Sequence, residues 1–339
     1  MRRWVPSFIL LALIWGNSFF FIKVALGSLH PLQISFGRMA IGALTLLVAL
    51  LATGRRLPRD PRLWGHFAVA SIVLTTVPFT LFGYGEQHVS SVLAAIWNAT
   101  TPLCTLLFAL LLRSERATAG RVTGLGLGFA GVMVVLGVWQ PISGGAMIGS
   151  LACFCAAACY GVGGAYMGRF ITPRGEEPIV LATAQLLAGT AELAVLTPLA
   201  GVALVDPHVP AGVWGSLVAL GAFGTGIAYL LLYRVQRMAG VMTTSTVTYL
   251  IPVFAAASGV VVLHEGLTWN QPVGALVVLA GIAVIQGLVP LRRVPRPATS
   301  PVARNPVARN PVARNPVAQN PVAPSSVAAP AAGEAEASA

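Results

Sequence analysis

Charged residues are scarce in this sequence, and acidic residues are the scarcest. The 339 residues include 21 lysines and arginines but only 10 aspartates and glutamates, so 9% of the chain is charged. A water-soluble domain carries about 25% charged residues. Because so little charge cannot cover a surface that faces water, we expect most of the chain to lie in a lipid bilayer. The net charge of +11 would favour nucleic-acid binding in a soluble protein. In a membrane protein the placement of the basic residues instead indicates which loops face the cytoplasm. No nucleic-acid partner is predicted.

Residue patterns for disulfide, metal or cofactor chemistry are also missing. The four cysteines all lie inside apolar runs: Cys104, Cys153, Cys155 and Cys159. We therefore predict neither a disulfide framework nor a zinc site. The five histidines are scattered, and no P-loop or dinucleotide-binding glycine motif is present. The sequence predicts no metal and no cofactor. An intramembrane enzyme would need carboxylates or histidines clustered near one interface, and the sequence has no such cluster.

What the chain has in abundance is long apolar runs. A membrane-spanning helix needs about 20 mostly apolar residues. Ten runs meet this length, at 5–26, 33–53, 64–83, 91–112, 121–139, 145–168, 178–199, 214–233, 242–263 and 272–291. The first run follows two arginines, as in a signal peptide, but no small-residue cleavage site comes after it, so we expect this span to be retained. The prediction is an all-α integral membrane protein with ten transmembrane helices.

Basic residues follow one side of these ten spans. Nineteen of the 21 lie before the first span, after the last one or in every second loop, and the opposite loops contain none. The remaining two, Lys23 and Arg38, fall inside spans. Because lysine and arginine accumulate in cytoplasmic loops, we predict that both termini are cytoplasmic. The short cytoplasmic ends favour a bacterial plasma membrane.

The last part of the chain has a different composition. Residues 301–323 repeat Pro-Val-Ala-Arg-Asn, with drift to Pro-Val-Ala-Gln-Asn. A proline at every fifth position prevents a continuous helix, and the segment has too little apolar bulk to fold. We predict a disordered cytoplasmic tail at 292–339. An inert extension is favoured over a weak attraction to anionic lipid.

The two halves of the chain align when the sequence is shifted by 150 positions. The pairs that this shift brings together are Trp64-Gly65 with Trp214-Gly215, Pro102 with Pro252, Glu115 with Glu265, Gly124 with Gly274 and Gly131 with Gly281. With small gaps, Trp15-Gly16 also falls near Tyr160-Gly161. We therefore predict two five-helix repeats, at 5–139 and 145–291. Because five is odd, the second repeat enters the membrane in the opposite sense. Inverted repeats are typical of secondary transporters, whose substrate site lies near the midplane between them.

These features resemble the EamA-type family of the drug/metabolite transporter superfamily. The likeness rests on Ala12-Leu13-Ile14-Trp15-Gly16-Asn17-Ser18, on Gly37-Arg38, and on the run from Pro102 through Glu115 to Gly131 that recurs from Pro252 through Glu265 to Gly281. The resemblance implies ten helices, export of small metabolites such as amino acids, or of drugs, and no ATP hydrolysis. Small multidrug relatives carry a proton-coupling glutamate in the first span, where this chain has Asn17 and Ser18 instead.

Ionisable residues inside a membrane are costly and are candidates for function. Arg38 and Glu192 fall at similar depth in the outer half of their spans, so we expect them either to pair or to face a shared cavity. A structural charge held by carbonyl groups is an equal alternative for Arg38. For Glu192, a structural carboxyl and a proton-coupling group are equally favoured. Lys23 is expected to extend to the interface. Glu265 has no basic residue nearby and is a candidate gate contact.

The candidate substrate cavity joins these charges with polar and aromatic residues of the spans. Its predicted members are Trp15, Asn17, Arg38, Trp97, Asn98, Thr101, Tyr160, Gln185, Glu192, Tyr229 and Tyr249. Taken singly, each is more often a packing or interfacial residue, but as a set they favour a cavity for an amphipathic solute. Pro102 and Pro252 each remove a helical hydrogen bond at matching positions, which makes them hinge candidates.

The leading hypothesis is a secondary transporter that exports a small metabolite such as an amino acid by alternating access. Its partners would be a small-molecule substrate, the bilayer and a possible coupling ion, the proton. A multidrug exporter of lipophilic cations is the alternative, and an intramembrane enzyme or a scaffold is favoured less. A stripe of small residues, Gly120, Gly124 and Gly128, permits close helix contact either inside the chain or in a homodimer.

Overall fold

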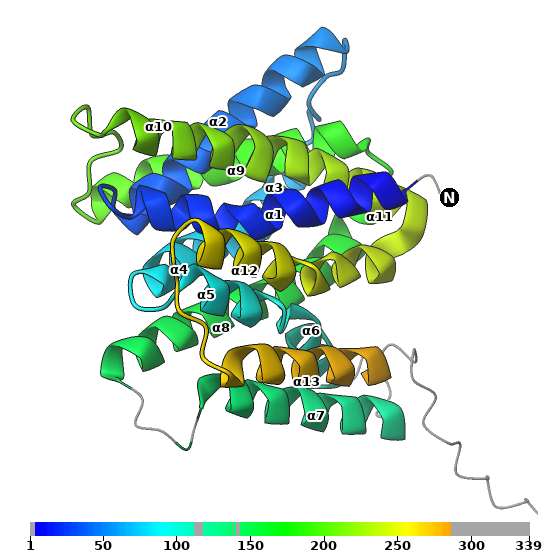
Figure 1. The fold of residues 1–339 in the computed structure, drawn as a ribbon. Coiled ribbons are helices and arrows are strands. Elements are labelled where there is room, and N and C mark those ends of the chain that lie inside the picture. Colours follow the sequence, from blue (N-terminus) through cyan, green and yellow to red (C-terminus); the bar gives the residue numbers. More distant parts are fainter. Residues whose placement is uncertain (1–3, 112–117, 138, 140–142, 286–339) are drawn as a thin grey trace, which may run out of the picture. The chain divides into compact units, whose positions relative to one another are not determined.

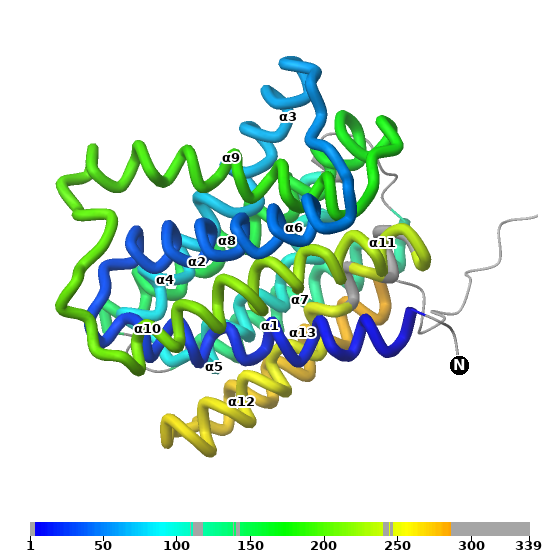
Figure 2. Tube along the Cα trace, turned by 90° about the horizontal axis from the view of Figure 1, so that it is seen from above, coloured from blue at the N-terminus to red at the C-terminus, as the bar shows by residue number. Residues whose placement is uncertain are grey.

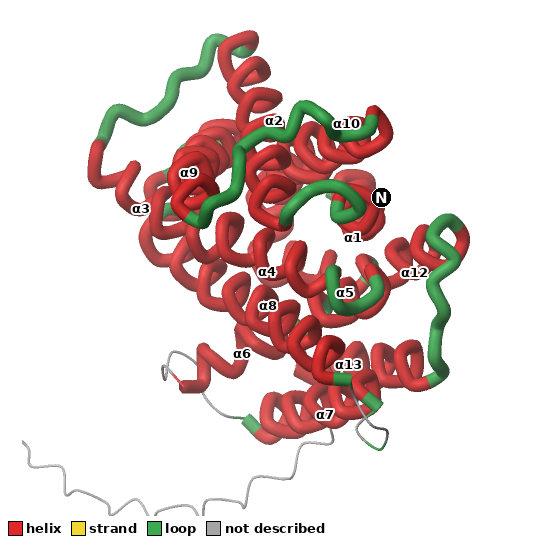
Figure 3. Tube along the Cα trace, turned by 90° about the vertical axis from the view of Figure 1, so that its left-hand side faces the viewer, coloured by secondary structure: helices red, strands yellow, loops and turns green. Residues whose placement is uncertain are grey.

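Every regular element in the described part of the chain is a helix (Figures 1 and 3). The structure is a computed structural model that describes residues 4–111, 118–137, 139 and 143–285. In chain order the elements are α1 (Val5–Ala25), α2 (Pro31–Ala52), α3 (Pro61–Ser71), the π-helix η1 (Ile72–Thr76), α4 (Val77–Glu86), α5 (Ser91–Asn98), α6 (Thr101–Leu111), α7 (Ala119–Leu136), α8 (Gly144–Phe170), the 3-10 helix η2 (Thr172–Arg174), α9 (Pro178–Leu199), α10 (Ala211–Val218), the π-helix η3 (Ala219–Ile227), α11 (Ala228–Ser245), the 3-10 helix η4 (Thr246–Tyr249), α12 (Ile251–Val261) and α13 (Asn270–Ile285).

These elements join into ten apolar helical units, which confirms the predicted all-helical membrane architecture. Eight units in the described residues are long and apolar enough to cross a membrane. Two shorter apolar units, Val247–Val261 and Asn270–Ile285, complete the ten. The predicted tail at 292–339 and Glu115 lie outside the described residues. Which side of the membrane each loop faces stays a prediction from the charge pattern.

The predicted loop between the eighth and ninth spans is wrong. The fall in hydrophobicity after residue 233 indicated a loop there, but α11 continues through Arg234 and Arg237 to Ser245. Arginine is a good helix former, and no proline interrupts this stretch. The two charges therefore end the apolar run without ending the helix.

The fourth span is interrupted, whereas the sequence predicted a continuous helix with a proline midway along it. α5 ends at Asn98, and α6 begins at Thr101. Pro102 therefore lies in the first turn of α6, where a missing N–H costs no helical hydrogen bond. The hydroxyl groups of Thr100 and Thr101 donate to the carbonyl oxygens of Trp97 and Asn98, each at 2.7 Å. The carbonyl of Trp97 also accepts the main-chain amide of Thr100 at 3.0 Å, so main-chain and side-chain donors together satisfy the carbonyl groups at the interruption.

The ninth span is interrupted at the matching place. The 3-10 helix η4 separates the end of α11 at Ser245 from the start of α12 at Ile251. Pro252 lies in the first turn of α12. Both hinge candidates thus follow a break in the helix, and neither kinks a continuous one. A hinge function for them stays a proposal.

Equivalent glycines make equivalent contacts in the two halves. A Cβ atom on Gly16 of α1 would lie 3.1 Å from the carbonyl oxygen of Ile251 in α12. A Cβ atom on Gly161 of α8 would lie 2.9 Å from the amide nitrogen of Thr105 in α6. The first helix of each repeat therefore packs on the interrupted span of the other repeat. α2 likewise packs along α9 (Figure 2) and against η3.

The glycine stripe of the fifth span is used inside the chain. α7 packs along α13 (Figures 1 and 3). A Cβ atom on Gly124 would lie 2.6 Å from the carbonyl oxygen of Gly281, and one on Gly131 would lie 2.9 Å from that of Gly274. Small residues allow the two backbones to approach this closely. The predicted homodimer therefore gains no support from the stripe.

Lys23 ties helix ends together at the end of the bundle opposite the arginine-rich loops. Its ammonium group donates to the main-chain oxygens of Glu86, at 2.5 Å, and Val89, at 2.9 Å. Its positive charge lies at the negative carbonyl end of α4, and its expected extension to the membrane interface stays a prediction. Its hydrogen bonds fix the last turn of α1 against α4.

Glu265 joins the two repeats at the same end of the bundle. Its carboxylate accepts hydrogen bonds from the amide and hydroxyl groups of Ser91, at 2.9 and 2.8 Å, and from the amide of Val92, at 3.2 Å. These donors form the start of α5, where the helix dipole favours a negative charge. A residue of the second repeat thus caps a helix of the first. A role as a gate contact stays a proposal.

The close approach of α8 to α6 predicts a difference between two alanine substitutions on one helix. Gly161→Ala should lower the melting temperature of the purified protein, because overpacking a close contact costs about 1–3 kcal/mol. Gly164→Ala should leave it unchanged or raise it, since no atom lies within 4 Å of the added carbon and alanine is a better helix former by about 1 kcal/mol. Equal melting temperatures for the two variants would contradict the predicted packing.

The cap formed by Glu265 predicts a loss of stability when its charge is removed. Glu265→Gln should destabilise the purified protein by about 1.5–3 kcal/mol, the range for hydrogen bonds to a charged group. The matched control is Glu177→Gln, because Glu177 pairs with Arg55 on the surface at 2.8 Å and such exposed pairs contribute about 0–1 kcal/mol. Thermal unfolding in detergent compares the two variants. A Glu265→Gln protein as stable as the control would show that the cap does not stabilise the folded protein.

Candidate functional site

A cavity of about 190 Å³ lies where both interrupted spans meet α1, α2, α4 and α8. The aromatic residues that line it are Trp15, Phe19, Phe79, Phe82, Tyr160, Tyr229 and Tyr233. The hydroxyl and amide residues that line it are Ser18, Asn98, Thr101, Thr244 and Thr248. An apolar cavity with a few placed polar groups is the usual form of a small-molecule site.

The two helix interruptions are what place polar groups in this cavity. Asn98 ends α5, and Thr101 begins α6. Thr248 of η4 occupies the position equivalent to Asn98 after the shift of 150. In a bilayer, irregular backbone is tolerated where protein buries it or where it lines a cavity. The breaks therefore supply polar groups to the cavity, and the cavity gives the irregular backbone a place away from lipid.

Arg38 is the one charged side chain among the described residues that line the cavity. Only 5% of its surface is exposed. Its Nε donates to the hydroxyl of Thr225 at 3.2 Å, and its guanidinium carbon lies 3.7 Å from the centre of the Phe79 ring. The π-helix η3 supplies Thr225, whose own hydroxyl donates to the carbonyl of Leu220 at 2.9 Å. These contacts fix the side chain while the other guanidinium N–H groups make no further hydrogen bond within the described residues.

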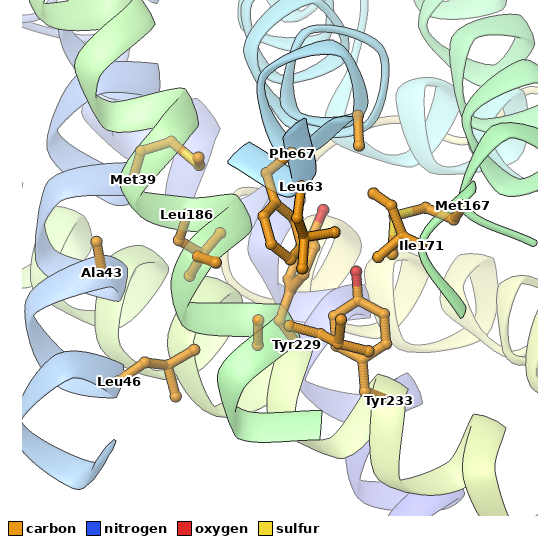
Figure 4. Packing of buried hydrophobic residues seen from close by; sticks show 14 of the residues in the cluster. Met39, Ala43, Leu46, Leu63, Phe67, Met167, Ile171, Leu186, Tyr229 and Tyr233 are labelled. Atoms are coloured by element: carbon orange, nitrogen blue, oxygen red, sulfur yellow. The ribbon is translucent and has the colours of Figure 1, made fainter. Parts of the chain in front are cut away.

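Aromatic contacts hold the remaining walls in place. The Tyr229 hydroxyl donates to the carbonyl oxygen of Leu74, in the π-helix η1, at 3.0 Å. Trp15 meets the Tyr229 ring edge to face at 6.3 Å between centroids, and Phe82 stacks on Tyr160 at 6.0 Å. Figure 4 shows Tyr229 beside Tyr233 at the edge of a buried hydrophobic cluster. These contacts join the aromatic side chains of the cavity wall across α1, η1, α4, α8 and α11.

Six of the eleven predicted cavity residues line this cavity. They are Trp15, Arg38, Asn98, Thr101, Tyr160 and Tyr229. Their role in binding a substrate is a proposal, because their position alone does not establish it. What they share is a place on the inner face of α1, α2, α8 or α11, or at the break in the fourth span.

The structure places the other five predicted residues outside the cavity. Asn17 faces another side of α1 and donates to the carbonyl of Leu13 at 2.8 Å. Trp97 is buried and packs edge to face on Phe154. Gln185 is buried and accepts a hydrogen bond from the Tyr233 hydroxyl. Tyr249 packs against a hydrophobic cluster that includes Phe19 and Trp97. The fifth residue is Glu192.

Glu192 and Arg38 are not brought together. The carboxylate of Glu192 accepts hydrogen bonds from the hydroxyl groups of Ser71 and Thr76, the latter at 2.6 Å. It lies between α9 and the third span and does not line the cavity. Counting residues gave the two side chains similar depth, but depth does not fix the face of a helix on which a side chain lies. Neither of the two expected arrangements, a pair across the repeats or a shared cavity, is present among the described residues.

The sequence reasoning missed several residues of the site. Phe79 and Phe82 lie three apart on α4, and Tyr233 lies four after Tyr229 on α11, so each pair shares a helix face. That spacing is the signal that would have found them. Glu86 was also missed, because the predicted span ends at residue 83 and puts it in a loop. In the structure α4 continues to Glu86, which is completely buried.

Comparison with known proteins gives a consistent result for both halves. The model of the EamA-like transporter family matches residues 2–137 and 147–287. A protein of Archaeoglobus fulgidus described as an uncharacterized transporter is 28% identical over 84% of this chain and 99% of its own length. The Escherichia coli protein described as the uncharacterized inner membrane transporter YedA is 26% identical over 76% of this chain and 83% of its own length.

A solved structure supports the architecture. One crystal structure aligns with a TM-score of 0.61 and 22% identity, and the alignment covers 85% of this chain and 99% of that chain. At this level of identity the likeness shows the fold alone. The family match, in contrast, spans most of the sequence and repeats in each half. This chain belongs to the EamA-like transporter family.

Proposed function

We propose that this protein is a secondary active transporter that exports small metabolites bearing a carboxylate, such as amino acids or their derivatives. Transport would proceed by alternating access around the cavity between the repeats. The direction, export, follows the family resemblance. A plasma-membrane location agrees with the inner-membrane description of the Escherichia coli relative.

The single observation that carries the proposed substrate class is the environment of Arg38. A guanidinium group presents N–H donors in a plane that matches the two oxygens of a carboxylate. Nε is engaged by Thr225, and Phe79 covers one face of the group. The outer N–H groups remain for a ligand, and no acidic side chain competes for them among the described residues lining the cavity.

The aromatic walls suit the rest of such a molecule. Trp15, Tyr160 and Tyr229 offer flat apolar surfaces and hydroxyl or indole groups close to the cavity. Asn98 and Thr101 add hydrogen-bonding groups at the broken span, where an amino or hydroxyl group of a ligand would find acceptors. The cavity volume of about 190 Å³ agrees with a small solute.

Lipophilic cations are the alternative substrate class, since aromatic faces attract cations. That hypothesis requires a carboxylate in the cavity, and the candidate for it was Glu192. Glu192 instead lies outside the cavity, bound by Ser71 and Thr76. A cavity whose lining charge is Arg38 repels a cation, so the alternative is disfavoured.

A resistance assay tests this proposal. Bacteria that express the protein should tolerate toxic amino-acid analogues better than bacteria that do not, with a lower intracellular content of the analogue. Arg38→Gln should reduce this resistance about tenfold or more, because hydrogen bonds to a charged group contribute about 1.5–3 kcal/mol. Arg38→Lys, which keeps the charge but loses the planar donor pattern, should retain part of it.

The control is Asn17→Ala, which changes a polar residue of the same depth outside the cavity and should leave resistance intact. Each variant is compared at equal membrane abundance, measured by immunoblot. Resistance to unrelated lipophilic cations that Arg38→Gln leaves unchanged, with none to the analogues, would overturn the proposed substrate class.

A further inference from the structure

Glu86 is a buried carboxyl group that the proposed substrate site does not use. It is the last residue of α4, and none of its surface is exposed. Neither carboxyl oxygen has a hydrogen-bond partner among the described residues. An ionised carboxylate in an apolar interior without donors is very costly, whereas the neutral acid is tolerated. The position at the end of a helix adds to this cost, because the carbonyl groups there are also negative.

The nearby basic groups do not pair with this carboxyl. Lys23 donates to the main-chain oxygens of Glu86 and Val89, not to the side chain. The hydrogen bond that Arg38 makes within the described residues goes to Thr225. The carboxyl oxygens of Glu86 therefore have no basic partner in the described part of the chain.

The neighbouring acidic group has the opposite environment. Glu265 caps the start of α5 at this end of the bundle. Its carboxylate accepts hydrogen bonds from three donors of Ser91 and Val92. Glu86 accepts none among the described residues, so the two carboxyl groups have unequal surroundings. On α8, the group that faces Glu86 is the thiol of Cys153, which is buried and offers only a weak donor.

Packing seals this group from water in the present conformation. A Cβ atom on Gly85 would lie 3.0 Å from the carbonyl oxygen of Gly149 in α8, so the two helices touch beside Glu86. Two further contacts lie at this end of the bundle, the cap of Glu265 on α5 and the hydrogen bonds from Lys23 to the end of α4. If these contacts separate, Glu86 meets water, and its charged form becomes favourable.

We propose that Glu86 is a proton-binding site, protonated while this end of the bundle is closed and deprotonated when it opens. A proton from water binds one carboxylate oxygen on closing and returns to water on opening. Phe82, one turn before Glu86 on α4, lines the cavity together with Arg38. The site therefore connects proton occupancy with the substrate cavity, and this coupling role rests on the proposed transport function.

Glu86 fits this role better than Glu192, the carboxyl that the sequence favoured for coupling. Glu192 is partly exposed and its carboxylate accepts two hydroxyl hydrogen bonds, whereas Glu86 is completely buried and accepts none among the described residues. Glu192 also does not line the cavity. Glu192 therefore serves as the matched control for Glu86.

Infrared difference spectroscopy tests the proton site without any substrate. The full-length protein in lipid nanodiscs is moved between mildly acidic and alkaline pH, and the carbonyl stretch of protonated carboxyl groups is followed. We expect a band that disappears on alkalisation in the natural protein and in Glu192→Gln. Glu86→Gln should lack this band, and Glu86→Asp should shift it.

A band that persists unchanged in Glu86→Gln and Glu86→Asp, or that is lost in Glu192→Gln, would overturn the proposal, as would its absence from the natural protein. Size-exclusion chromatography confirms that each variant is folded. Because no substrate enters this experiment, the proton site can fail while resistance to amino-acid analogues stands, and the reverse also holds.

Discussion

Inside a bilayer no water is present to bond an exposed peptide group, so every break in a membrane-spanning helix must be satisfied by protein. This constraint governs the two interruptions of the fourth and ninth spans. Thr100 and Thr101 bond the carbonyl groups at the first break. Glycines of α1 and α8 let these helices approach the broken spans closely. The cavity occurs where the breaks face each other, because only there can irregular backbone present polar groups without meeting lipid.

The two repeats share one arrangement of helices, and substitutions make the cavity between them asymmetric. When His30-Pro31 at the start of α2 is aligned with Glu177-Pro178 at the start of α9, Arg38 falls on Gln185. Arg38 lines the cavity, whereas Gln185 is buried and accepts a hydrogen bond from the Tyr233 hydroxyl. The equivalent π-helices diverge in the same way, since η3 provides Thr225 to Arg38 while η1 provides Thr76 to Glu192. Arg38 thus supplies the single charge among the described residues that line the cavity. In our account this charge decides what the protein binds.

Much of the fold could be predicted from the sequence, because the length of apolar runs is a strong signal in a membrane protein. The shift of 150 positions predicted which helices are equivalent, and the contacts of Gly16 and Gly161 agree with it. The end of α11 could not be predicted in this way, since arginine ends an apolar run but not a helix. The sequence also did not predict the breaks before Pro102 and Pro252. A proline indicates that one helical hydrogen bond is missing, but it does not show whether the helix ends and a new one begins.

The site was harder to predict than the fold. Residue type and the estimated depth within each span identified Arg38 and Tyr229 as cavity residues. They could not show that Glu192 lies on another face of its helix or that Glu86 is buried. Both facts depend on which helices pack together. The most direct test of our account is the melting temperature of the purified protein with amino acids and with their carboxamides, which lack the negative charge. We predict stabilisation by at least one amino acid, about 2.7 kcal/mol near 100 times its Kd, and none by its carboxamide. Equal stabilisation by the two forms would contradict the central role of Arg38.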